Sequence, residues 1–529
     1  MKAKKYIIFW IAILFVHAIV WLSVSNSTII GGDAFFSYGL SNETEGFLFW
    51  DLNQIEAHTD ETGWIKGEDV YSYLTVDENE AFDYSAVWNN QQKDVHPPLY
   101  YALLHTVCSI FTGKYSKWFG LIINIMIAIL VDIIIYKIVL EIGLRQKSAL
   151  FITFFYGLLP GNLQLVSYVR MYELLSLWCI VLIWLHLKLL HKKGKYTYIM
   201  LAVTLVCGGL THYFFWVFAG ICFCGYMLHL YIQGELRTLS VKYVTYMVSG
   251  GLISVLIFPY SIYHMFFSSK GDGILGTLFS FQFYGKEYMI LLDDSVFCGQ
   301  IGWFLIIFLI FLIWNVFLGK ENWENINRKE YAPLFVFLCG AVYALFIMKT
   351  SSTVTWYYLS PCFTALCIGA YAMFSILFEN VLSTAERKVR IIASALICIG
   401  ITFFVTRGAY SYAQSNVGYA EAMKAYYQPI LQEEKKDVIF LYHSWNNLFG
   451  GKLDFVAYAD EIYVADIQEV ENTDWQQCIQ NRQSADDILV LIQRSEDYES
   501  DFERIQQYLP VKLELYQASG VMLYEATKK

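Results

Sequence analysis

Eleven long apolar runs constrain the fold of this chain more than any other feature. Apolar residues make up 57% of its 529 residues and charged residues only 16%, a composition that excludes an ordinary soluble protein. About 20 apolar residues suffice for a helix to span a bilayer. We therefore predict a polytopic α-helical membrane protein with about 11 transmembrane helices, at residues 6–24, 118–140, 149–168, 172–190, 197–211, 213–232, 241–263, 300–318, 332–348, 356–379 and 390–406.

A twelfth apolar run, residues 97–112, determines the orientation of everything after it. It is 16 residues long and opens with Pro97 and Pro98. If it does not cross the membrane, every predicted cytoplasmic loop contains Lys or Arg; if it does cross, all these basic loops face outward. Basic residues favour the cytoplasmic side. We therefore predict a juxtamembrane or re-entrant helix here, and a first transmembrane helix that starts in the cytoplasm.

The character of the sequence changes after Arg407, which divides it into a transmembrane domain (1–407) and a C-terminal domain (408–529). Beyond this point the apolar runs have the length of strands. The sequence predicts an extracytoplasmic α/β domain without a glycine-rich phosphate loop. Its strands are expected at 437–442, 461–465, 487–493, 512–516 and 521–526, and its helices at 419–435, 447–459, 474–482 and 498–508.

The first outer loop, residues 25–96, is strongly acidic. It contains 14 Asp and Glu against two Lys, whereas the net charge of the whole protein is −10. Most of these carboxylates are explained as a solvated surface. Asp33 and Asp94 have special neighbours, because Asp33 follows two glycines just beyond the first helix and Asp94 precedes Pro97 and Pro98. Two such carboxylates near the membrane surface could deprotonate a nucleophile or hold a cation.

Three more polar residues interrupt apolar runs on the predicted outer side: Arg170, Glu173 and His212. Ionisable groups at such depths are unfavourable enough to suggest a task. Taken singly, Arg170 is equally well explained as an interfacial anchor, and His212 as an ordinary helix-end histidine. Most of the 11 cysteines lie inside apolar runs and predict no disulfide framework, and no Lys/Arg-rich run indicates a nucleic-acid partner.

Four motifs in the first 410 residues together resemble those of the GT-C membrane glycosyltransferases, in particular the superfamily of protein O-mannosyltransferases and aminoarabinose transferases. The most specific is Asp-Val-His-Pro-Pro-Leu-Tyr-Tyr at residues 94–101. The others are Gly32-Asp33, Val-Arg-Met-Tyr-Glu-Leu-Leu at 169–175, and Leu-Thr-His-Tyr at 210–213.

This resemblance implies a GT-C fold and an inverting transfer of a hexose or pentose from a polyprenyl-phosphate donor to an acceptor glycan, lipid or protein. It implies that Asp33 is the catalytic base. Arg170, Lys93 and His96 would hold the donor phosphate, Glu173 and His212 would contribute to substrate binding, and Asp94 would assist catalysis or bind a divalent cation such as Mg or Mn. No nucleotide is required, and the expected location is the plasma membrane.

Two departures from the family pattern affect these assignments. The family often has an acidic pair where this chain has Asp33-Ala34, so a second carboxylate must come from elsewhere, with Asp94 the best candidate. Where some relatives carry Lys or Arg near the Pro-Pro element, this chain has Lys93 and His96. The Trp-Trp-Asp signature of oligosaccharyltransferases is absent. A transporter or flippase for a lipid-linked or small polar substrate and a membrane-anchored binding or scaffold protein remain as alternatives.

Overall fold

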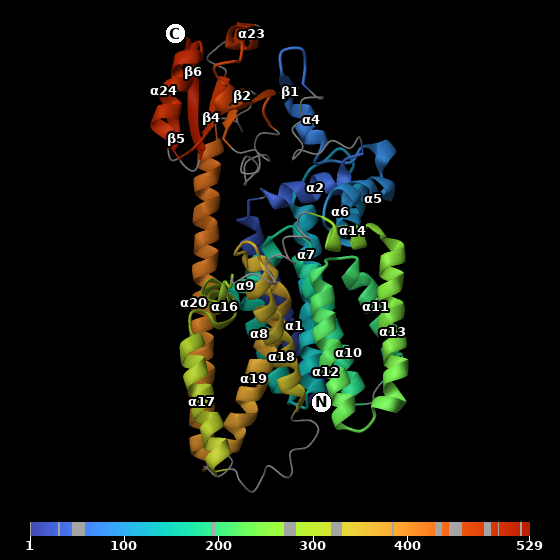
Figure 1. Cartoon of the computed structure of the whole chain (residues 1–529). Helices are drawn as coiled ribbons and strands as arrows, with labels where there is room; N and C mark the ends of the chain where they lie inside the picture. Colours follow the sequence, from blue (N-terminus) through green and yellow to red (C-terminus); the bar gives the residue numbers. More distant parts are fainter. Residues whose placement is uncertain are drawn as a thin grey trace. The chain divides into compact units, whose positions relative to one another are not determined.

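A computed structural model describes residues 2–29, 32–44, 59–191, 194, 196–268, 282–318, 331–382, 386–428, 436–443, 458–480, 488–495, 497–518 and 521–528 (Figure 1). The chain divides into two compact units. The first, which we call the helical unit, comprises Met1–Asn26, Asp94–Tyr100 and Gly120–Asn416. The second, the sheet unit, comprises Ser27–Lys93, Tyr101–Phe119 and Val417–Lys529.

Eight helices in the described part of the chain are long and apolar enough to cross a membrane. Two further pairs of helices, each bent at a short break, raise this number to ten if each pair counts as one span. The eight are α1 (Lys2–Asn26), α7 (Lys117–Glu141), α10 (Tyr172–Leu190), α12 (Phe214–Ile232), α13 (Leu236–Ile257), α18 (Tyr331–Thr350), α19 (Ser360–Leu382) and α20 (Arg387–Tyr427).

The bent pairs have local causes in the sequence. α8 (Gln146–Leu158) and α9 (Pro160–Ser167) meet at 59°, and Pro160 is the first residue of α9, a position at which proline starts a new helix. The second pair joins α16 (Gly285–Leu292) and η2 (Asp293–Phe297) to α17 (Ile301–Leu318) at 80°. There Cys298 and Gly299 have positive φ angles of 54° and 78°, which end the helical path.

The predicted fold class is confirmed, and the number of spans agrees closely with the eleven expected. Eight long helices and two bent pairs give ten, and the eleventh prediction, 197–211, corresponds to α11 (Thr197–Gly209), an apolar helix of only 13 residues. α6 (Leu99–Ile110) covers the ambiguous run 97–112. Its 12 residues rise about 18 Å, less than the ~30 Å of a hydrocarbon core.

The sheet unit contains a six-stranded sheet in the order β1-β3-β2-β4-β6-β5. β2 (Asp437–Tyr442) is parallel to β3 (Glu461–Asp466) and to β4 (Ile488–Gln493). β6 (Val521–Lys528) is antiparallel to β4 and to β5 (Val511–Ala518). Of the predicted helices, 474–482 appears as α23 (Trp475–Gln480) and 498–508 as α24 (Tyr498–Tyr508), whereas 447–459 falls almost entirely outside the described residues.

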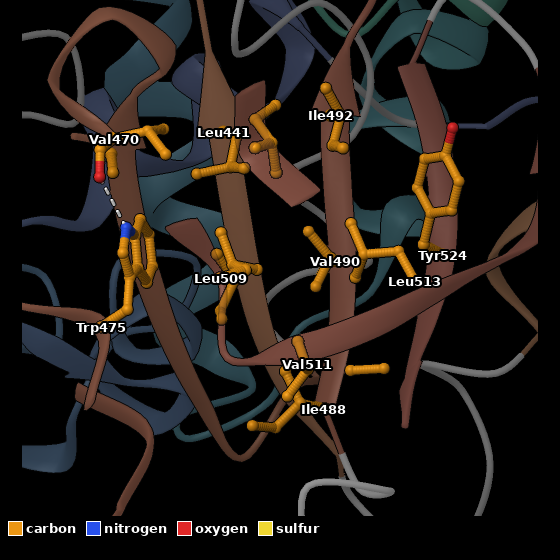
Figure 2. Packing of buried hydrophobic residues seen from close by; sticks show 14 of the residues in the cluster. Leu441, Val470, Trp475, Ile488, Val490, Ile492, Leu509, Val511, Leu513 and Tyr524 are labelled. Atoms are coloured by element: carbon orange, nitrogen blue, oxygen red, sulfur yellow. Dashed lines mark hydrogen bonds between the residues drawn. The ribbon is translucent and has the colours of Figure 1, made fainter. Parts of the chain in front are cut away.

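The core of this sheet is a continuous apolar cluster between strands and helices (Figure 2). Leu441, Val490 and Ile492 line the parallel strands, while Leu509 follows α24. The indole of Trp475 donates a hydrogen bond to the carbonyl oxygen of Val470 at 2.8 Å, so its one polar atom is satisfied inside the cluster.

The acidic loop is more ordered than a solvated surface requires. It forms α2 (Asp33–Asn42), β1 (Trp64–Lys66), α4 (Gly67–Ser72), η1 (Glu78–Glu80) and α5 (Tyr84–Lys93). β1 is the terminal strand of the sheet described above, paired antiparallel with β3. The sequence did not predict this strand, because three residues are too few to show the alternation that identifies one.

Candidate functional site

The segment that begins with Asp94 brings two predicted residues together in the helical unit. The Nδ1 atom of His96 lies 2.6 Å from Oδ2 of Asp94, and the two side chains are 12% and 17% exposed. Pro97 and Pro98 are buried behind this pair. The backbone N–H of Leu99 donates to the carbonyl oxygen of Leu210 at 2.9 Å. This bond holds the segment beside the turn between α11 and α12.

That turn contains His212, the next predicted residue. Its ring centroid is 5.8 Å from that of His96 and 5.5 Å from that of Tyr172. The backbone N–H of Phe214 donates to Nδ1 of His212 at 3.1 Å. Since Nδ1 accepts this bond, a neutral His212 carries its proton on Nε2. His212 therefore belongs to the same cluster as the Asp94–His96 pair.

Aromatic rings from three segments pack against Tyr172 and Phe214, the two aromatic residues that contact His212. Tyr172 stacks on Tyr357 with centroids 4.6 Å apart, and Tyr168 stacks on Tyr357 at 5.6 Å. Tyr357 belongs to η5 (Trp356–Leu359), the short helix before α19. Phe214 meets Tyr358 edge-on at 5.1 Å. The cluster thus combines hydrogen-bonding histidines with aromatic faces, the mixture that binding pockets for small polar molecules use.

Arg170 lies between the two tyrosines of this cluster in the sequence. Its backbone N–H donates to the carbonyl oxygen of Tyr168 at 2.7 Å in the tight turn before α10, and the residue is 6% exposed. The rings of Tyr168 and Tyr172 are nearly parallel, with centroids 6.1 Å apart. A simple interfacial anchor would be more exposed than this.

Glu173 is completely buried in the first turn of α10. Neither carboxylate oxygen has a hydrogen-bond partner among the residues that the structure describes. The positive end of the helix dipole favours an acidic residue at this position. No described contact joins Glu173 to the histidine cluster, so its predicted role in substrate binding is a proposal that rests on sequence position.

The other two predicted residues, Asp33 and Lys93, belong to the sheet unit. Asp33 is half-buried and is the first residue of α2, where the helix dipole favours a carboxylate. Gly32 before it has φ 55° and ψ −125°, which a residue with a side chain rarely adopts. Lys93 is exposed at the end of α5.

A second buried histidine–carboxylate pair was missed by the sequence analysis. His17 of α1 lies with Nδ1 2.7 Å from Oδ2 of Asp132 of α7, and the side chains are 0% and 1% exposed. The Nε2 atom of His17 lies 3.0 Å from the carbonyl oxygen of Phe154. The available signal was an Asp within the apolar run 118–140, since charges inside membrane helices are rare.

The described part of the chain contains no group of three or more His, Cys, Asp or Glu side chains that could hold a metal ion. Mg²⁺ is often held by one or two carboxylates together with substrate phosphates. The Asp94 carboxylate, already next to His96, is compatible with that minimal arrangement. A divalent cation at Asp94 is therefore kept as a proposal.

The sequence matches no protein-family profile and no curated protein. Solved structures are similar over nearly the whole chain. ArnT from Cupriavidus metallidurans bound to undecaprenyl phosphate matches with a TM-score of 0.51 and 13% identity, over 99% of this chain and 98% of ArnT. The apo state of the same protein matches with a TM-score of 0.52 and 10% identity, over the same shares.

This chain has the fold of ArnT. The GT-C fold that the motifs imply is thereby confirmed, from the first membrane helix to the C-terminal sheet. At 10–13% identity the likeness concerns the fold and leaves the chemistry to the residues of this chain.

Proposed function

We propose that this protein is an inverting glycosyltransferase that moves a hexose or pentose from a polyprenyl-phosphate donor to the hydroxyl group of an acceptor glycan, lipid or protein. The observation that carries the proposal is the cluster of Asp94, His96, His212 and Tyr172 in a chain with the fold of ArnT. One ArnT structure contains undecaprenyl phosphate, which is the chemical class of the leaving group proposed here.

In the proposed reaction, Asp33 accepts the proton of the acceptor hydroxyl. The oxygen attacks the anomeric carbon as the bond from that carbon to the phosphate oxygen breaks. Polyprenyl phosphate leaves on the opposite face with the bonding electron pair. A positioned general base of this kind typically contributes about 10² to 10⁴ in rate.

The leaving phosphate needs positive charge and hydrogen-bond donors in a partly dry site. Arg170 offers a planar fork that can hold two phosphate oxygens at once. His96, whose Nδ1 lies 2.6 Å from Oδ2 of Asp94, and the neighbouring His212 are the further hydrogen-bond donors proposed for the phosphate. Lys93, next to Asp94 in the sequence, is proposed as a further cation. A divalent ion held by Asp94 would supply additional neutralisation of the phosphate.

We place the protein in the plasma membrane, with the acidic loop and the C-terminal sheet on the extracytoplasmic side, because the predicted cytoplasmic loops are basic. A lipid-borne donor is consistent with this location, since it brings the activated sugar to the membrane surface without a nucleotide.

Asp33→Asn tests the proposal in a deletion strain complemented with the wild-type or the variant gene. Mass spectrometry of envelope glycans and glycolipids should reveal a sugar-bearing species that disappears on deletion, returns with the wild type and stays absent with Asp33→Asn at equal protein levels. Glu78→Gln, an exposed change in the same loop, is the matched control and should restore the species. A fully restored species in the Asp33→Asn strain would exclude Asp33 as the base; a flippase would tolerate this variant.

A further inference from the structure

Residues 60–76 of the acidic loop, which we call the hook, are built into the C-terminal sheet at one end. β1 pairs with β3 in the register Trp64 opposite Tyr463, Ile65 opposite Ile462 and Lys66 opposite Glu461. Trp64 is 1% exposed and belongs to the apolar core of the sheet. Its indole N–H donates to the carbonyl oxygen of Cys478 at 3.2 Å.

The backbone on both sides of Trp64 is fitted to this attachment. Oδ1 of Asp60 accepts hydrogen bonds from the backbone N–H groups of Thr62 and Trp64 at 2.7 and 3.0 Å, which shapes the turn before the strand. After the strand, the N–H of Gly67 donates to the carbonyl oxygen of Asp460 at 2.8 Å. A Cβ atom on Gly67 would lie 2.0 Å from the carbonyl oxygen of Ala459, so only glycine permits this approach.

The other end of the hook packs against α2, the helix that starts with Asp33. The ring of Tyr73 stacks on Phe35 with centroids 5.2 Å apart. A Cβ atom on Gly39 would fall 1.7 Å from the Tyr73 ring, so the ring lies directly against the α2 backbone. Asn42 donates from Nδ2 to the carbonyl oxygen of Leu74 at 2.9 Å. Phe35, Asn42, Tyr73 and Leu74 are all buried.

We propose that the C-terminal sheet positions Asp33 through the hook. All the contacts in this chain of interactions lie within the sheet unit: β3 holds β1, α4 follows β1 directly, and residues 73–74 hold α2. Trp64 and Gly67 are thus positioning residues for the proposed base, more than 25 residues away in the sequence. The catalytic consequence rests on the proposed function, whereas the mechanical coupling does not.

This inference gives the C-terminal domain a task. A helix of ten residues such as α2 is only marginally stable by itself in water, so its position depends on tertiary contacts. Contacts from the hook cover Phe35, Gly39 and Asn42, which are spaced by four and three residues and therefore lie on one face of α2. Loosening the hook should leave the Asp33 side chain chemically unchanged but allow α2, which carries it, to move.

Hydrogen exchange in the full-length protein tests the coupling directly. Trp64→Ala and Gly67→Ala should each raise amide exchange in peptides covering residues 33–42, at least about threefold over the wild type. Leu513→Ala is the matched control, because Leu513 is buried in the same core but on β5, at the opposite end of the sheet order. The control should leave the exchange of residues 33–42 unchanged. If β1 exchanges faster while residues 33–42 do not, the proposal is wrong.

A kinetic measurement then links the coupling to catalysis. The hook variants should lower kcat by about 10 to 10² with little change in KM for the donor, as expected for a misplaced catalytic group. In the Trp64→Ala background, Lys66→Cys and Glu461→Cys place two cysteines at facing positions of β1 and β3. Oxidation to a disulfide should restore kcat, and reduction should lower kcat again. Failure of the oxidised pair to restore kcat in a folded protein would overturn the positioning role. If instead Asp33→Asn retains activity while exchange remains coupled, the proposed function fails and the hook stands.

Discussion

Two histidine–aspartate pairs in the described part of the helical unit have almost the same geometry and very different surroundings. His17 and Asp132 are 2.7 Å apart, and His96 and Asp94 are 2.6 Å apart. The first pair is sealed: both side chains are at most 1% exposed, and the second ring nitrogen of His17 lies 3.0 Å from the carbonyl oxygen of Phe154. The second pair is 12% and 17% exposed and faces another histidine, His212.

The difference between the pairs shows that access, and not the pair itself, separates a structural contact from a candidate site. The ring of His17 is further enclosed by Trp21, at a centroid distance of 5.0 Å, so no substrate could reach it. His96 is partly exposed, and its ring lies beside His212, whose own ring contacts Tyr172 and Phe214. We expect removal of the first pair to affect folding and removal of the second to affect turnover.

The largest effect is expected from Asp132→Ala. Loss of one partner leaves the other polar group buried without compensation, which typically costs about 3 to 5 kcal/mol. Equilibrium unfolding in mixed detergent micelles should show this loss, and Asp132→Asn, which can still hydrogen-bond to His17, should recover a large part of it. A stability of Asp132→Ala equal to the wild type would remove the structural role of the sealed pair.

Asp94→Asn should produce the opposite pattern. The carboxamide fills the same space but no longer stabilises a protonated His96, so transfer should fall by about 10², the order seen when a group that stabilises developing charge is lost. The free energy of unfolding should change by no more than about 1 kcal/mol. Turnover and unfolding are measured on the same preparation. Large destabilisation with normal specific activity would show that the Asp94–His96 pair, too, is structural.

Arg170 allows a finer test of how the donor phosphate is bound. Arg170→Lys keeps the positive charge but loses the planar fork, so donor use should drop by roughly tenfold, and Arg170→Ala should lose more. The readouts are turnover and affinity for undecaprenyl phosphate. If the Lys variant is as active as the parent, Arg170 acts as an interfacial anchor and does not bind the donor phosphate.

The smallest effect concerns His105 of α6, which is buried with no carboxylate within ion-pair distance among the described residues. Burial lowers its pKa below the ordinary value of about 6.5, and the nearby carboxylates Asp83 and Glu80 oppose the shift only in part. Below about pH 6.5 the unfolded chain therefore binds a proton that the folded chain does not, and stability falls by at most about 1.4 kcal/mol per pH unit.

Melting temperatures at pH 7.5 and 5.5 measure this effect, with His105→Gln as the comparison. The variant should lose part of the acid sensitivity. Equal sensitivity in both proteins would show that the titration of His105 does not contribute to the acid sensitivity.

Hydrophobic periodicity was sufficient to predict the long apolar helices and most of the C-terminal strands, but not the short elements of the acidic loop. α10, β2 and α24 begin and end where the sequence predicts, because each is a clean apolar or alternating run between polar ends. The predicted span 241–263 fails at its end: α13 stops at Ile257, and Pro259 starts the short helix α14 (Tyr260–Phe266). A proline cannot continue the hydrogen bonding of the preceding helix.

The site could be predicted only in part, because contacts between distant residues leave no local pattern. Asp94 and His96 are two positions apart in one motif and were each predicted as site residues, although their contact was not; His17 and Asp132, 115 positions apart, were not predicted at all. The proximity of His96, His212 and Tyr172 could likewise be recognised only from the structure. The roles assigned to all the predicted site residues stay predictions: Asp33, Asp94, Lys93, His96, Arg170, Glu173 and His212.

The pairing of β1 with β3 has one more consequence, for the behaviour of the protein among its own copies. Without β1, the six residues of β3 would present an unpaired backbone edge to solvent, and such edges recruit strands from other molecules and promote aggregation. β1 replaces this edge with one of only three residues, which ends in the charged Lys66 and is followed by Glu68 in α4. We therefore expect the acidic loop also to protect the C-terminal sheet against edge-to-edge association.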